Sequence, residues 1–156
     1  MISDLKITHV CRVDCPPVDV WHVLGEFTDL KWLPGPEYVT IGEHEGQLAR
    51  ILHFQSGSGI EPIIEYLLSK DDQLMTFEYG VIKHAFVPVE GYRARVSVSA
   101  LELGAEISFT GTYTERVSQQ DEVNAMLKGA YQMMGECVGR YVSERQSYYA
   151  IAEPLQ

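Results

Sequence analysis

Hydrophobic and polar residues alternate along most of this chain. Residues 6–14 read KITHVCRVD, in which Ile7, His9, Cys11 and Val13 share one face, and this pattern predicts a β-strand. From residue 37 onward the alternation recurs in short segments separated by turn-forming sequences such as SGSG and KDD. Those segments predict strands at 37–42, 47–55, 60–69, 73–82, 91–101 and 104–116. Such short connections leave no room for crossover helices, so the predicted sheet is antiparallel.

Helical spacing follows the first strand. The segment CPPVDVWHVLGEF, residues 15–27, has prolines near its start and apolar residues at helical spacing, which predicts a short helix. The next segment, TDLKWLPG at residues 28–35, predicts a second short helical turn that ends at its Pro-Gly pair.

Residues 121–148 predict one long C-terminal helix. An apolar stripe runs from Val123 to Tyr141 at three- and four-residue spacing. Three glycines interrupt the segment, and each weakens a helix by about 1 kcal/mol relative to alanine. The helix is therefore expected to depend on packing against the sheet.

These elements predict an α+β fold in one domain, residues 1–156, with a core at about 5–148. A curved seven-stranded antiparallel sheet would wrap around the long C-terminal helix, with two short helices after the first strand. One helix cannot fill a strongly curved sheet. An internal cavity is therefore expected between them, and such a cavity suits an apolar ligand.

Composition narrows the function classes. The net charge of −10 argues against binding to a nucleic-acid backbone, which requires clustered Lys and Arg. No apolar run reaches the length of a membrane span and no signal peptide is evident, so we expect a cytoplasmic protein without membrane insertion. The three cysteines are expected to be free thiols. No motif indicates a metal site or a cofactor.

Several motifs, in this order, resemble the polyketide cyclase/dehydrase branch of the START-like (SRPBCC) superfamily. They are VDCPPVDVWHVLGEFTDLKWLP, GQLARILHF, IEYLLSKDD, FEYGVI, VPVEGYRARVSV and AEISFTGTY, and together they span about residues 5–145. The resemblance implies the helix-grip fold described above. It does not specify a reaction, because the superfamily includes cyclases, lipid carriers, hormone receptors and allergens.

Arg50 and Glu65 are the first candidate site residues. A hairpin closing near residues 56–58 would place them opposite each other. Alternation alone would bury Ile64 and Tyr66 and expose Glu65. The resemblance implies the opposite phase, with Arg50 and Glu65 facing the cavity, and we adopt that phase. Arg50 would then bind a ligand oxygen and Glu65 would act as a base, unless the pair only fixes the strand register.

Aromatic and apolar residues on the inner faces complete the expected site. Tyr79 and Tyr92 are candidates for catalysis alongside Arg50 and Glu65, although core packing is the alternative interpretation. His84 lies in a loop expected to border the cavity. The candidate ligand-binding residues are His9, Trp32, Leu52, Phe54, Phe77, Phe109, Tyr113, Tyr131 and Met134. For His9, the alternative is a core histidine bonded to a neighbour.

The adopted phase leaves Ile64, Tyr66 and Leu68 on the outer face of the sheet. An exposed apolar patch of this kind is typical of a partner surface, so we expect a homodimer or another contact there.

Three functions fit these observations. The first is binding of a hydrophobic, aromatic or polyketide-like small molecule, with cofactor-free cyclisation or dehydration if the protein is an enzyme. The second is a non-catalytic carrier or sensor for a hydrophobic ligand. The third is a protein-interaction module whose cavity is incidental.

Overall fold

The computed structural model describes residues 4–83, 90–114 and 120–152. Seven strands in these residues form one antiparallel sheet in the order β1-β7-β6-β5-β4-β3-β2. The elements are β1 (Asp4–Val13), α1 (Pro17–Leu24), β2 (Tyr38–His44), β3 (Gln47–His53), β4 (Ile63–Asp71), β5 (Thr76–Lys83), β6 (Glu90–Ala100), β7 (Ala105–Thr114) and α2 (Gln120–Ala152). His84, a predicted neighbour of the cavity, lies outside the described residues.

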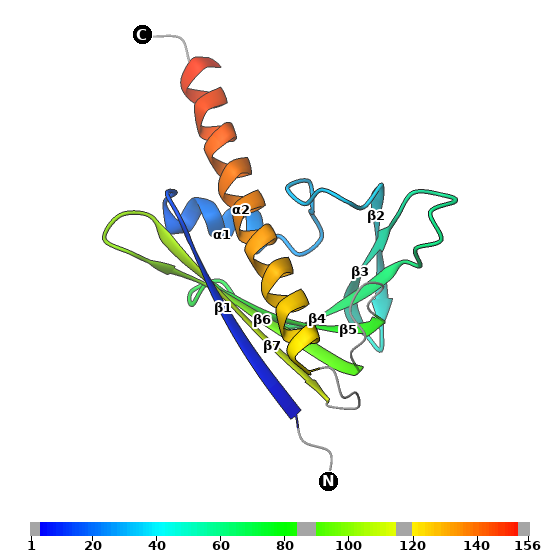
Figure 1. Cartoon of the computed structure of the whole chain (residues 1–156). Coiled ribbons are helices and arrows are strands. Elements are labelled where there is room, and N and C mark those ends of the chain that lie inside the picture. Colours follow the sequence, from blue (N-terminus) through cyan, green and yellow to red (C-terminus); the bar gives the residue numbers. More distant parts are fainter. Residues whose placement is uncertain (1–3, 84–89, 115–119, 153–156) are drawn as a thin grey trace.

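The sheet curves, and α2 crosses its concave side with α1 beside it (Figure 1). Helix α2 packs mainly against β1, and α1 packs against α2 and β6. Buried apolar residues from both helices and from the inner sheet face form one continuous core. The predicted helix-grip architecture is therefore confirmed, with one exception in the segment after α1.

The predicted second short helix does not form. Residues 28–35 adopt turns, in which Leu33 N donates to Leu30 O at 2.9 Å without continuing into a helix. The Asp29 carboxylate accepts a hydrogen bond from Lys31 N at 3.1 Å, which competes with helical bonding. Pro34 and Pro36 lack the N–H groups that a helix would need.

Close contact between α2 and β1 depends on glycine. A Cβ atom built on Gly135 would lie 2.6 Å from Cys11 Sγ, and one on Gly139 would lie 2.9 Å from Val13 Cγ1. The third helical glycine, Gly129, has no such neighbour within 4 Å. At Gly135 and Gly139, the missing side chain is therefore what lets α2 pack closely against β1.

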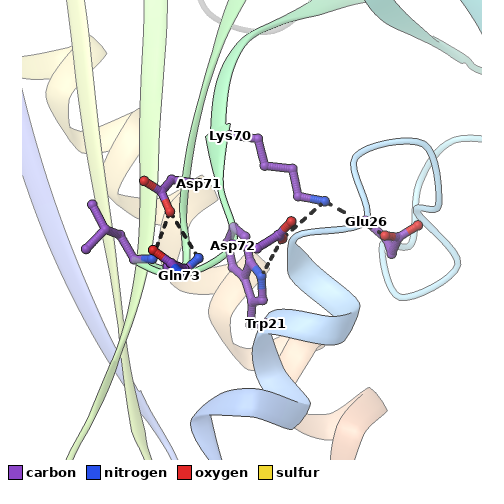
Figure 2. Close-up of polar contacts among 7 residues, drawn as sticks. Trp21, Glu26, Lys70, Asp71, Asp72 and Gln73 are labelled. Carbon is purple, nitrogen blue, oxygen red and sulfur yellow. Dashed lines mark hydrogen bonds and ion pairs between the residues drawn. The ribbon is translucent and has the colours of Figure 1, made fainter.

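The turn between β4 and β5 is fastened to α1 (Figure 2). Trp21 Nε1 donates to Asp72 Oδ1 at 3.0 Å. Lys70 Nζ lies 3.6 Å from Asp72 Oδ1 and 3.9 Å from Glu26 Oε1. Within the turn, Asp71 Oδ1 accepts hydrogen bonds from Gln73 N at 3.0 Å and from Leu74 N at 3.1 Å. These contacts hold the far end of the β4–β5 hairpin against α1.

Strand β4 has the phase that the family resemblance implied. Glu65 is buried on the inner side, whereas Ile64, Tyr66 and Leu68 are half-buried. Alternation alone therefore gave the wrong face. The Tyr66 ring packs directly on Gly80 of the neighbouring strand, because a Cβ atom built there would overlap Tyr66 Cζ. This contact covers part of the outer apolar patch. The homodimer contact expected there stays a prediction.

No helix in the described part of the chain is long and apolar enough to cross a membrane.

Candidate functional site

A pocket of about 370 Å³ lies between α2, the inner face of β3–β6 and the loop after α1. Its wall is largely apolar. The loop contributes Leu30, Trp32, Leu33, Pro34, Gly35 and Pro36; the sheet side contributes Arg50, Leu52, Phe54, Ile63, Glu65, Tyr79 and Tyr92; and α2 contributes Leu127, Ala130, Tyr131, Met133 and Met134.

Arg50 and Glu65 form a buried ion pair in this wall. They are direct cross-strand partners in the β3–β4 register, as the hairpin predicted. Arg50 Nε donates to Glu65 Oε1 at 2.7 Å, and the residues are only 3% and 8% exposed. Among the described residues, Arg50 Nη2 and Glu65 Oε2 have no hydrogen-bond partner. The pair thus keeps one donor group and one acceptor atom for another molecule.

Phe27 holds the Arg50 side chain from a second direction. Its backbone oxygen accepts a hydrogen bond from Arg50 Nη1 at 2.8 Å. The guanidinium carbon lies 4.1 Å from the centre of the Phe27 ring and 5.3 Å from that of Tyr79. Both ring faces favour a cation. Arg50 is therefore fixed in place by a carboxylate, a carbonyl and two aromatic rings.

Three tyrosine hydroxyls form the neighbouring polar surface. Burial raises the pKa of Tyr79 and of Tyr92 far above the ordinary value, and it raises the pKa of Tyr131 to about 12. The hydroxyls of Tyr92 and Tyr131 are hydrogen-bonded to each other. All three phenols therefore stay protonated near neutral pH, which suits them to donate hydrogen bonds and not to accept protons.

Trp32 contributes a polar atom that lacks a partner. Its Nε1 is fully buried and has no hydrogen-bond partner among the described residues. Such a donor costs free energy unless something accepts its hydrogen. The other tryptophan, Trp21, has its Nε1 bonded to Asp72.

Nine of the predicted site residues line the pocket, including all four candidates for catalysis. They are Arg50, Glu65, Tyr79, Tyr92, Trp32, Leu52, Phe54, Tyr131 and Met134.

Four predicted ligand-binding residues lie outside the pocket. His9 Nε2 pairs with Gln132 Oε1 at 2.7 Å, which is the neighbour-bonded alternative. Phe77 packs between Trp21, Phe27 and Tyr79 in the core. Phe109 is buried beneath Tyr131, with ring centres 5.1 Å apart. The Tyr113 hydroxyl donates to Asn124 Oδ1 at 2.7 Å.

Sequence reasoning missed much of the pocket wall. The sequence predicts a helical turn at residues 28–35, and the loop formed there supplies several wall residues around Trp32. Ile63 shares the inner face with Glu65, so the adopted phase of β4 could have identified it. Leu127 and Ala130 belong to the apolar stripe that predicted the long helix. No sequence signal marks the Phe27 carbonyl as a partner of Arg50.

The fold and the pocket define a helix-grip protein. The sequence matches the family described as "Polyketide cyclase / dehydrase and lipid transport" over residues 4–135, and the chain belongs to this family. The family expected from the motifs is thereby confirmed. Among curated proteins, none is significantly similar in sequence to this chain.

Three solved structures share this fold at low sequence identity. Norcoclaurine synthase from Thalictrum flavum, in complex with dopamine and hydroxybenzaldehyde, aligns with a TM-score of 0.72 at 18% identity, covering 92% of this chain and 88% of that one. Ara h 8.0201 aligns at 0.73 and 15% identity, covering 91% and 99%. An uncharacterised protein from Bacillus thuringiensis aligns at 0.71 and 21% identity, covering 88% and 98%.

Proposed function

We propose that this protein binds a hydrophobic, aromatic small molecule in the pocket between α2 and the sheet. The observation that carries the proposal is the composition of the pocket wall. A volume of about 370 Å³ is lined by aliphatic, aromatic and methionine side chains around one buried ion pair. Small-molecule sites typically combine an apolar wall with a few fixed polar groups.

Two further observations support this proposal. Methionines on α2, Met133 and Met134, give the wall an adaptable side. A structurally similar protein, norcoclaurine synthase, is known in complex with two phenolic molecules. A protein-interaction module, the third function considered from the sequence, does not require a pocket of this kind.

Binding can be tested with the neutral fluorescent probe N-phenyl-1-naphthylamine. We expect saturable fluorescence enhancement with the wild-type protein and its loss in Ala130→Trp, which fills the pocket. Met126→Trp places the same side chain on the same helix at an exposed position and should leave binding unchanged. Equal binding by both variants would locate the probe elsewhere and contradict the proposal. Native mass spectrometry of protein purified from cells, followed by denaturing extraction, would identify a retained natural ligand.

A second candidate function is cofactor-free cyclisation or dehydration of the bound molecule. The observation favouring it is the unpartnered Glu65 Oε2 beside phenols that stay protonated. Glu65 would take a proton next to a ligand carbonyl while a phenol or Arg50 donates to the carbonyl oxygen. Turnover of a model polyketide chain, lost in Glu65→Gln with binding retained, would support catalysis. Tight binding without turnover would favour a carrier.

A further inference from the structure

The Arg50–Glu65 pair leaves the pocket wall without net charge. Among the described residues that line the pocket, these two alone carry a formal charge at neutral pH. The 2.7 Å contact between Arg50 Nε and Glu65 Oε1 brings the opposite charges together where little water reaches them. A second anion entering this wall would meet an already neutralised arginine and the Glu65 carboxylate.

The positive charge of Arg50 is already compensated by its neighbours in the protein. Besides Glu65, it has the Phe27 carbonyl and the faces of the Phe27 and Tyr79 rings around its guanidinium group. All of these partners are electron-rich. Two of the five N–H donors of Arg50 are used by Glu65 and Phe27. The Nη2 group, which has no partner among the described residues, can still donate hydrogen bonds to a neutral oxygen.

The remaining polar groups are neutral dipoles. The phenols of Tyr79, Tyr92 and Tyr131 are protonated at neutral pH, and burial raises the pKa of each still further above its ordinary value. The Trp32 indole is a neutral donor that is buried without a partner. The wall therefore supplies several donors and the single carboxylate acceptor Glu65 Oε2, without an excess of positive charge.

Resting on the proposed function, we propose that the pocket selects neutral aromatic ligands whose polar group is a carbonyl or hydroxyl, and that it rejects aromatic carboxylates. A ketone oxygen can accept from Arg50 Nη2 without adding charge, and a ligand hydroxyl can also donate to Glu65. A carboxylate would be desolvated beside Glu65 with no free cation to compensate it.

The test compares 2-acetonaphthone with 2-naphthoate, which share the same ring system and differ in the polar group. Each displaces N-phenyl-1-naphthylamine from the wild-type protein at neutral pH. We expect the ketone to bind at least about tenfold more tightly than the carboxylate. Equal affinities, tighter binding of the carboxylate, or failure of both ligands while the probe binds would overturn this inference. Failure of the probe itself would overturn the proposed function as well.

Glu65→Gln provides the sharper test, because it removes the neutralising charge and leaves Arg50 as a free cation. The preference should then shift by at least about tenfold towards the carboxylate. Glu43→Gln makes the same change in net charge on exposed β2 surface and should leave the preference unchanged. A Glu65→Gln protein that retains the wild-type preference would contradict the inference. If this variant fails to fold, the double variant Arg50→Met/Glu65→Leu replaces it, and it should still reject the carboxylate.

Discussion

Arg50 and Glu65, fifteen residues apart in the chain, face each other across β3 and β4 and are joined at 2.7 Å. Their side chains are buried, so their charges gain from each other but lose most of their hydration. The ion pair therefore contributes less to the free energy of unfolding than its short distance suggests. Removing one of the two charges leaves the other buried without a partner, whereas removing both leaves no uncompensated charge.

This dependence predicts a strongly non-additive result. Arg50→Met leaves the Glu65 carboxylate buried without its partner and should lower the free energy of unfolding by about 3–5 kcal/mol. Arg50→Met/Glu65→Leu removes both charges and should recover most of that loss. Urea denaturation of the wild type and the variants measures both values.

The exposed pair Lys31–Asp29, 4.0 Å apart, provides the control. Lys31→Met should change the free energy of unfolding by less than about 1 kcal/mol, because surface ion pairs contribute little. A double variant as unstable as Arg50→Met alone would show that packing of the side chains matters more than their charges.

The two tryptophans make a second comparison, since both are 6% exposed but differ in hydrogen bonding. Trp21→Phe removes the bond to Asp72 drawn in Figure 2, whereas Trp32→Phe removes an N–H group that has no partner. Trp21→Phe should therefore be more destabilising by about 1 kcal/mol. Thermal unfolding in the absence of ligand measures the difference. A larger loss of stability in Trp32→Phe than in Trp21→Phe would mean that the Trp32 N–H has a hydrogen-bond partner in solution.

Two glycines of α2 should respond oppositely to alanine. Gly129 has open space around it, so Gly129→Ala should raise the free energy of unfolding by up to about 1 kcal/mol through helix propensity. Gly135→Ala would press a methyl group against Cys11, with its Cβ 2.6 Å from the sulfur, and should be destabilising. Stabilisation by both substitutions, measured by urea denaturation, would show that α2 can move away from β1 at little cost.

The sequence could predict which strands pair and which faces turn inward. The turn-forming residues at 56–59 and the alternation around them place Arg50 opposite Glu65, because cross-strand partners share a face. Alternation alone still favoured the wrong phase for β4, since Ile64 and Tyr66 are apolar. The family resemblance resolved this point because it carries information about the whole sheet.

Whether an inward-facing side chain reaches the pocket or is covered by other side chains could not be predicted in the same way. Phe77 and Phe109 lie on inner faces, as predicted, but other aromatic rings cover them and exclude them from the pocket. Periodicity gives the direction of a side chain and not what packs above it. Residues 28–35 predict a helical turn, and of this loop only Trp32 was expected in the pocket wall. The wall position of its neighbours Leu30, Leu33 and Pro34 followed only from the folded chain.

The buried phenols predict a loss of stability in alkali. An unfolded tyrosine ionises at about pH 10, whereas burial raises the pKa of Tyr131 to about 12. In this window the unfolded chain has released a proton that the folded chain retains, so the free energy of unfolding falls as the pH rises. Tyr131→Phe should make this fall shallower while keeping the ring that stacks on Phe109. Urea denaturation at several alkaline pH values measures the slope, with Met126→Leu on the same helix as a control that removes no hydroxyl. An unchanged slope in Tyr131→Phe would mean that this phenol ionises equally easily in the folded and unfolded chains.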